Sequence, residues 1–170
     1  MTTSTVQRVA AIMVFGIGAV FARPTIADGL VTTHRVSVTL ANEAVATAVA
    51  ACAQQGYAVV AVLVDTDGVR QAMLRGDGAG IASLESAYDK AFTSIAVKTD
   101  TGIAVERAKT APGLQIFFNK IPHLLLGQGG IVIRAGEEPI AALGVGGAPG
   151  GEKDEACARA ALDKISDRLK

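Results

Sequence analysis

The first half of the chain opens with two contrasting hydrophobic patterns. Apolar residues recur at helical spacing over residues 40–55, which predicts a helix that Thr39 caps and Gly56 ends. A near-continuous apolar run, rich in β-branched residues, follows over 58–64. Such a run is typical of a strand that is buried on both faces of a sheet. This part of the sequence therefore predicts a helix followed by a central strand.

A tight turn, a second strand and a second helix come next. Residues 65–68 are polar and end in glycine, which permits positive φ, so they predict a hairpin turn. Apolar and polar residues alternate over 69–75, as expected of the returning strand. Glycines interrupt the pattern at 76–80, and a helical period then runs over 81–97.

The second half contains the same kinds of element with a less regular middle. A short helix is predicted over 99–109, and Pro112 with Gly113 is expected to end it. Residues 114–126 are apolar but irregular, and Pro122 interrupts them. Two strands and a last helix are then predicted, over 131–134, 139–146 and 152–169.

This order of elements defines a fold class. Hairpins, rather than helical crossovers between parallel strands, indicate a mostly antiparallel sheet. Because helices precede, separate and follow the hairpins, we expect an α+β fold with helices on the faces of the sheet. No polar linker interrupts residues 28–170, so we expect them to form a single domain.

Residues 1–27 have the pattern of a signal peptide. Arg8 supplies a positive charge, and Val9–Ala22 form an apolar stretch of about 14 residues, shorter than the roughly 20 that a membrane-spanning helix needs. Small residues favour cleavage after Ala27. The sequence therefore predicts a secreted or periplasmic protein without an integral membrane segment after processing; the alternative is a buried N-terminal helix.

Composition excludes several classes of function. The chain carries 16 basic and 16 acidic residues, and half of its residues are apolar. No basic patch is present, so we expect no nucleic-acid partner. No serine lies in a nucleophile elbow and no zinc-protease motif occurs. The glycine-rich stretch 144–151 matches neither common phosphate-binding motif, and we interpret it as a flexible connector.

The two cysteines admit two interpretations. Cys52 and Cys157 both lie on the apolar faces of predicted helices, so the simpler interpretation is a pair of buried thiols. Export would also permit a disulfide bond if the two helices are neighbours.

Several segments together resemble a known family. VRQAMLRGDGAG, SLESAYDKAFTS, IPHLLLGQGGIVI and EPIAALGVGGAPGGEKDEACARAAL are similar to the GlcG/HbpS-like haem-binding family, which also forms the C-terminal domain of PduO-type proteins. The resemblance implies a profilin-like antiparallel sheet of about five strands flanked by helices. It also implies homo-oligomers, haem binding in some members, and haem or iron handling or sensing in secreted members.

One segment combines the residue types that a haem site needs. Phe117 and Phe118 can contact the macrocycle, His123 can donate to the iron, and Lys120 can approach a propionate. Arg75, beside two glycines, could also bind a propionate. The alternatives are ordinary core phenylalanines, a loop histidine and a surface arginine.

The second predicted helix offers a candidate metal site. Secreted members of the family carry a Glu-x-x-Glu pair there that is linked to iron binding; in this chain Glu85 matches the first glutamate and Tyr88 replaces the second. The sequence interpretation places Asp89 off their shared face. A solvated glutamate beside a half-buried tyrosine is the alternative. Lys90 could face the same cleft or water.

These observations together predict an exported protein that binds haem or a related tetrapyrrole and handles or senses iron. The first alternative is a small enzyme on the same scaffold that acts on haem or a small organic acid. The second is an oligomeric assembly module without a ligand. The sequence does not identify a sensor or receptor partner.

Overall fold

The computed structural model describes residues 29–169. The predicted signal peptide and its cleavage site lie outside the described residues. From Thr33 onward the chain forms one compact unit. Within the described residues, no helix is both long and apolar enough to cross a membrane.

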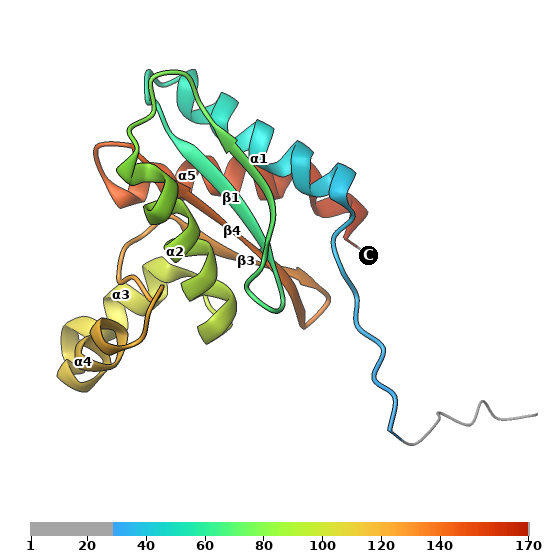
Figure 1. The fold of residues 1–170 in the computed structure, drawn as a ribbon, viewed down its shortest axis with the longest axis vertical. Coiled ribbons are helices and arrows are strands. Elements are labelled where there is room, and N and C mark those ends of the chain that lie inside the picture. Colours follow the sequence, from blue (N-terminus) through green and yellow to red (C-terminus); the bar gives the residue numbers. More distant parts are fainter. Residues whose placement is uncertain (1–28, 170) are drawn as a thin grey trace, which may run out of the picture. The chain divides into compact units, whose positions relative to one another are not determined.

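Helices and strands follow one another in the expected order (Figure 1). The described part of the chain contains five α-helices, four strands and a short 3-10 helix: α1 (Val38–Ala53), β1 (Val60–Asp65), β2 (Arg70–Arg75), α2 (Ala82–Val97), α3 (Thr101–Thr110), α4 (Pro112–Lys120), β3 (Gly130–Ala135), β4 (Glu138–Gly146), α5 (Gly151–Ile165) and η1 (Ser166–Arg168).

The strands form one antiparallel sheet in the order β2-β1-β4-β3. This confirms the α+β class and the antiparallel layout, although the sheet has four strands and not about five. The two hairpins pair along β1 and β4, so these two strands are central. Helices α1 and α5 cover one face of the sheet, and α2 covers the other (Figure 1).

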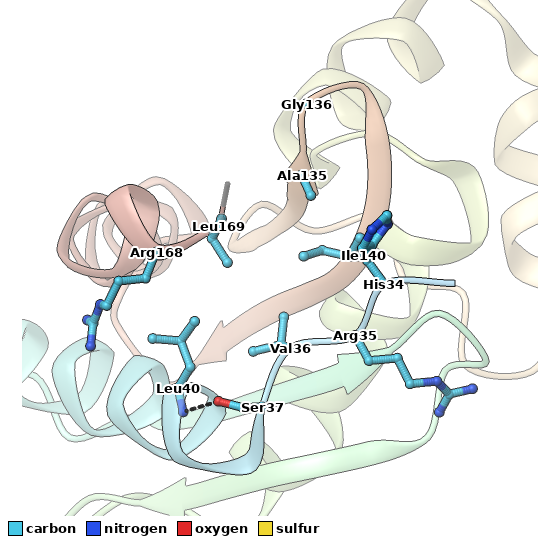
Figure 2. Close-up of a pocket in the computed structure, with 10 residues that line it drawn as sticks. All are labelled: His34, Arg35, Val36, Ser37, Leu40, Ala135, Gly136, Ile140, Arg168 and Leu169. Atoms are coloured by element: carbon cyan, nitrogen blue, oxygen red, sulfur yellow. Dashed lines mark hydrogen bonds between the residues drawn. The ribbon is translucent and has the colours of Figure 1, made fainter. Parts of the chain in front are cut away.

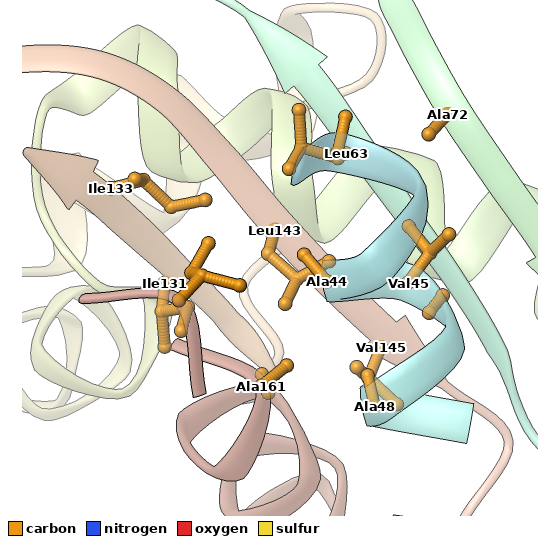
Figure 3. Packing of buried hydrophobic residues seen from close by; sticks show 14 of the residues in the cluster. Ala44, Val45, Ala48, Leu63, Ala72, Ile131, Ile133, Leu143, Val145 and Ala161 are labelled. Carbon is orange, nitrogen blue, oxygen red and sulfur yellow. The ribbon is translucent and has the colours of Figure 1, made fainter. Parts of the chain in front are cut away.

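Strand β1 is apolar at almost every position because both of its faces are buried. Val60, Val62 and Val64 belong to the cluster with α2, whereas Ala61 and Leu63 belong to the cluster with α1 and α5. Because side chains alternate between the faces of a strand, a strand covered on both faces needs apolar residues throughout. Figure 3 shows the larger cluster, in which the longer side chains of the sheet meet small residues of the helices.

Helix α2 approaches its face of the sheet closely. Gly144 of β4 lies beneath α2, and a Cβ atom there would lie 2.1 Å from the backbone oxygen of Ala87 and 2.5 Å from the nitrogen of Ala91. The backbone of α2 therefore lies directly on β4. This close approach fixes where the residues on the outer side of α2 stand.

The structure corrects one predicted helix cap and adds one helix. Ser37, and not Thr39, caps α1, because its Oγ accepts a hydrogen bond from the amide of Leu40 at 3.2 Å. The short middle helix α3 ends at Thr110, just before Pro112, as predicted, but Pro112 also begins a further helix, α4, since proline fits the first turn of a helix, where no amide hydrogen is needed. The segment expected to be irregular is therefore helical as far as Lys120.

Cys52 and Cys157 form a disulfide bond between α1 and α5. The two helices pack side by side on one face of the sheet, and the Cα atoms of the two cysteines lie 5.5 Å apart. The simpler expectation of two free thiols was wrong, because sequence periodicity places each cysteine on a core face but does not show that the two faces meet.

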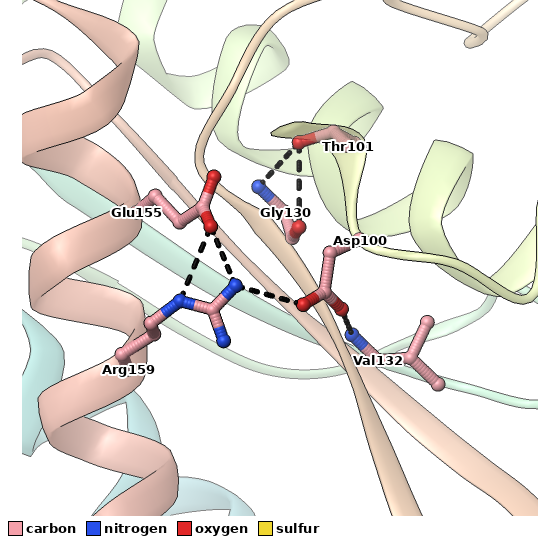
Figure 4. A network of polar contacts seen from close by, with 6 residues as sticks. All are labelled: Asp100, Thr101, Gly130, Val132, Glu155 and Arg159. Atoms are coloured by element: carbon pink, nitrogen blue, oxygen red, sulfur yellow. Dashed lines mark hydrogen bonds and ion pairs between the residues drawn. The ribbon is translucent and has the colours of Figure 1, made fainter. Parts of the chain in front are cut away.

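Polar contacts tie α3 to β3 and α5 (Figure 4). Asp100 accepts hydrogen bonds from the amide of Val132 and from the guanidinium of Arg159, each at 2.9 Å. Thr101 bonds both backbone groups of Gly130. Hydrogen bonds to Glu155, ahead of those to Asp100, raise the pKa of Arg159. These bonds anchor the start of α3 beside the edge strand.

Candidate functional site

One face of α2 gathers chemically active side chains. Glu85, Tyr88, Asp89 and Phe92 follow the spacing i, i+3, i+4 and i+7, which places them on one side of the helix. Asp89 therefore shares the face of Glu85 and Tyr88, contrary to the sequence interpretation. The reason is geometric, because four residues turn an α-helix by slightly more than one full rotation.

The loop after α4 places His123 against this face. The buried hydroxyl of Thr93, one turn further along α2, accepts a hydrogen bond from the amide of Leu125 at 2.7 Å and donates one to the carbonyl of His123 at 3.4 Å. His123 itself has a positive φ of 65°. Two hydrogen bonds thus fasten the loop to α2 on either side of Leu124.

His123 is held by a carboxylate and two aromatic rings. Its Nδ1 lies 2.9 Å from Oδ1 of Asp89, and its ring meets the rings of Tyr88 and Phe92 edge-on, with centroids 5.1 and 5.8 Å away. The side chains of His123 and Asp89 are 48% and 26% exposed. Among the described residues, the second ring nitrogen has no hydrogen-bond partner. The imidazole is therefore oriented by protein contacts while one nitrogen stays available.

A cation borders the same face. Arg70 of β2 pairs with Glu85 at 3.1 Å, and its guanidinium carbon lies 3.5 Å from the ring centroid of Tyr88. The hydroxyl of Tyr88 donates to the carbonyl of Gly68 at 3.3 Å. Beside these residues, Met73 and Leu84 join Arg70 and Glu85 around a hollow of about 210 Å³.

The predicted phenylalanines lie elsewhere. Phe117 and Phe118 meet edge-on at 5.7 Å and line a small cavity of about 120 Å³ between α2, α3 and α4, whose lining does not include His123. Phe118 is buried and Phe117 is half exposed. Lys120 is exposed at the end of α4. The structure therefore does not bring the aromatic pair to the histidine, because α4 separates residues that the sequence places together.

Two other charged residues have structural partners. Arg75 donates two hydrogen bonds to the carbonyl of Ala79 in its own glycine loop, one of them at 2.8 Å. Lys90 faces neither a cleft nor water: it is buried and paired with Asp154 at 2.7 Å. Asp154 also accepts from the amide of Ala148 at 3.0 Å, which ties down the glycine-rich connector.

The largest of the described cavities shares no lining residue with the face around His123 (Figure 2). It has a volume of about 470 Å³ and is lined by the segment before α1, the β3–β4 turn and the residues after α5. Its basic side chains already have carboxylate partners: Arg168 pairs with Glu43, Arg35 with Asp65 and Asp67, and His34 with Glu138. The hydrogen bonds between Arg168 and Glu43 lower the pKa of the glutamate and raise the pKa of the arginine. The hydrogen bond from His34 lowers the pKa of Glu138. The described part of this cavity therefore combines an apolar interior with basic side chains that carboxylates already engage.

The face around His123 fits haem in its donor chemistry. It provides an imidazole oriented by a carboxylate, aromatic edges, and Arg70 as a cation for a propionate. The hollow at Arg70 and Leu84 does not include His123, so a macrocycle held by the histidine would extend over an open face beside this hollow.

Sequence reasoning missed Asp89, Phe92 and Arg70 at this site. The helical spacing from Glu85 could have identified Asp89 and Phe92, since positions i+4 and i+7 share a helix face. Arg70 has no such signal, because its place beside Glu85 depends on how β2 packs against α2.

The chain is similar to several proteins of known structure. HbpS matches at 36% identity with a TM-score of 0.75, covering 81% of this chain and 94% of that chain. A glutamate-to-aspartate double mutant of HbpS from Streptomyces reticuli matches at 36% identity and TM-score 0.75, over 85% and 97% of the two chains. PduOC in complex with heme matches at 26% identity and TM-score 0.71, over 78% and 96%.

No curated protein sequence matches the chain. A family model does: residues 36–163 match the family described as haem degrading protein HbpS-like. This match spans most of the chain and all four strands, and it agrees with the resemblance in the sequence motifs. The chain therefore belongs to the HbpS-like family.

Proposed function

We propose that the protein binds haem, or a related tetrapyrrole, on the face formed by α2 and the loop after α4. The imidazole of His123 would hold the iron. The observation that carries this proposal is the contact between Nδ1 of His123 and Asp89. Histidines that bind metals usually donate their other ring nitrogen to a carboxylate or carbonyl, which fixes the ring and raises its basicity.

Neighbouring residues supply the other contacts in this proposal. Tyr88 and Phe92 offer apolar edges, the hollow beside Leu84 accepts part of the macrocycle, and Arg70 pairs with a propionate. Bound haem would provide an iron centre, and the histidine would tune its redox chemistry. The family match and the structural similarity to the PduOC heme complex support a tetrapyrrole as the ligand.

We also propose that the protein works outside the cytoplasm, as a homo-oligomer that handles or senses iron. The pattern of residues 1–27 supports export. The Cys52–Cys157 bond agrees with it, because disulfides persist in oxidising compartments. Because the face around His123 is open, a second copy of the chain would cover the ligand.

Haemin titration of the purified protein, made without a histidine tag, tests the binding site. We expect a saturable shift of the Soret band. His123→Ala should remove the spectrum of the ligated iron and weaken binding at least about tenfold. Asp89→Asn should keep His123 as the donor but weaken haemin binding about 10-fold. It should also raise the reduction potential of the haem iron, since the imidazole donates less electron density without the carboxylate.

His34 provides the matched control. It is the other histidine of the chain, and its Nδ1 also pairs with a carboxylate, Glu138, at 2.6 Å. His34→Ala should leave the Soret titration unchanged. Equal effects of the two alanine substitutions, or an unaltered spectrum in His123→Ala, would reject His123 as the donor.

The family description favours haem degradation as a second candidate function. The same samples distinguish the two functions. Bound haem that keeps its Soret band under a reductant and oxygen indicates binding alone. Loss of the band together with an open-chain tetrapyrrole product indicates an enzyme.

A further inference from the structure

Three potential metal donors from two separate segments converge on the outer face of α2. Glu85 and Asp89 stand one helical turn apart, and His123 comes from the loop after α4. One ligand atom from each of them lies within 4.8 Å of the others. Donors in a tetrahedral zinc site lie about 3.3–3.5 Å apart, given bond lengths near 2.0–2.1 Å. Small side-chain rotations would therefore bring the three donors around one ion.

We propose that Glu85, Asp89 and His123 bind a free divalent transition-metal ion of borderline softness, of the Zn²⁺ and Co²⁺ class. The donor set decides the class of ion. Mg²⁺ and Ca²⁺ prefer oxygen ligands only, whereas one imidazole with two carboxylates suits zinc-like ions. Three protein donors leave a fourth position to water, as in open zinc sites.

This donor set differs from a pair of glutamates three residues apart. Tyr88 stands where such a second glutamate would be, and its hydroxyl donates to the carbonyl of Gly68. The second carboxylate comes instead from Asp89, and a nitrogen donor is added by a different segment of the chain. The change from oxygen donors alone to mixed donors shifts the preference from hard cations to borderline ones.

Two contacts must change when the ion binds. The ion takes the place of the hydrogen bond between Nδ1 of His123 and Asp89. It also draws Glu85 away from Arg70. The side chains of Arg70 and Glu85 are 43% and 66% exposed, and exposed ion pairs contribute little stability, so this exchange costs little. Thr93 keeps the loop of His123 on α2 throughout.

Titration of the haem-free, untagged protein with Co²⁺ tests the proposal, because coordinated Co²⁺ absorbs in the visible region. We expect one Co²⁺ per chain, displaced by Zn²⁺ and not by Mg²⁺. His123→Ala, Asp89→Asn and Glu85→Gln should each weaken binding at least about tenfold. Far-UV circular dichroism confirms that each variant is folded.

Two further variants sharpen the test. Arg70→Gln removes the cation that competes for Glu85 and should tighten Co²⁺ binding about two- to fivefold, the equivalent of a weak surface ion pair. His34→Ala should leave the titration unchanged, since His34 pairs with one carboxylate outside the three-donor cluster.

Co²⁺ binding that survives His123→Ala, or Mg²⁺ that competes as well as Zn²⁺, would overturn the proposal. A titration in which the protein does not bind one molar equivalent of Co²⁺ would also overturn the proposal. The measurement uses no haem, so it can fail while the haem titration succeeds, and the reverse also holds. If both proposals are right, Zn²⁺ and haemin compete for one imidazole.

Discussion

Lys90 shows how a single side chain can link elements that are distant in sequence. Its ammonium group bonds the carbonyl of Val145 at 3.0 Å and Asp154 at 2.7 Å, and both charged side chains are less than a tenth exposed. The pair therefore joins α2, β4 and α5 at one buried point. The sequence did not show whether Lys90 faces a cleft or water, and burial was not expected, because lysines are rarely buried and periodicity does not reveal a buried partner.

Removal of one partner should therefore destabilise the fold. Lys90→Met leaves the carboxylate of Asp154 buried with only the amide of Ala148 as a partner, and we expect a loss of about 3–5 kcal/mol in the free energy of unfolding. Urea denaturation measures this loss.

Lys109 supplies the control, because it pairs with Glu106 on the surface and is 62% exposed. Lys109→Met should change the free energy of unfolding by less than about 0.5 kcal/mol. The double variant Lys90→Met with Asp154→Leu should recover part of the loss. Similar losses in both lysine variants would contradict a special role for the buried pair.

At the scale of elements, the sequence predicted most strands and helices but not every boundary. The run of apolar residues over β1 identified a central strand, because burial on both faces leaves few alternatives. Helix α4 was missed because Pro112 and Gly113 usually interrupt helices, and the local pattern does not show that Pro112 stands in a first turn.

The candidate site, like the helices and strands, was predictable only in part. Residue types pointed to His123 and Glu85, and helical spacing contained the information that adds Asp89. The pair Phe117 and Phe118 shows the limit. Phe117 lies close to His123 in sequence, but the aromatic edges beside the histidine come from Tyr88 and Phe92 of another helix. Proximity between segments depends on tertiary packing, which sequence spacing does not describe.

The close packing of α2 on β4 predicts that a side chain at position 144 destabilises the fold. Gly144→Ala would drive a methyl group into the backbone of α2, so the helix must move. We expect a loss of about 1–3 kcal/mol in the free energy of unfolding. Haemin and Co²⁺ affinities should fall as well, because α2 carries the donors.

Gly113→Ala is the matched control for this substitution. Nothing lies within 4 Å of a Cβ atom at Gly113, which belongs to α4. This variant should be neutral or more stable by up to about 1 kcal/mol, since alanine favours helices. A Gly144→Ala protein as stable as this control would show that α2 adjusts freely.

At the scale of the whole molecule, the disulfide bond joins the first helix to the last. Cys52 and Cys157 are separated by 105 positions, and all four strands lie between them. A closed loop of about 100 residues restricts the unfolded chain strongly, which chain-entropy estimates put near 4.7 kcal/mol. The bond thus acts on the fold as a whole.

Loss of the bond should lower stability without changing the fold. We expect Cys52→Ala with Cys157→Ala to reduce the free energy of unfolding by about 2–5 kcal/mol, measured by urea denaturation against the oxidised protein. Under a strong reductant the oxidised protein should approach the stability of the variant, while the variant itself should not respond. A reductant that affects both proteins equally would argue against the bond as the cause.

The cavity of Figure 2 has a consequence for protein engineering. The segment around Val36 and the residue Leu169 line the same space, so the two ends of the fold are neighbours, and Arg168 holds Glu43 of the first helix. A short peptide could connect them, and the exposed hairpin at Gly136 offers a place for new termini. The fold therefore permits circular permutation with new termini in the β3–β4 turn.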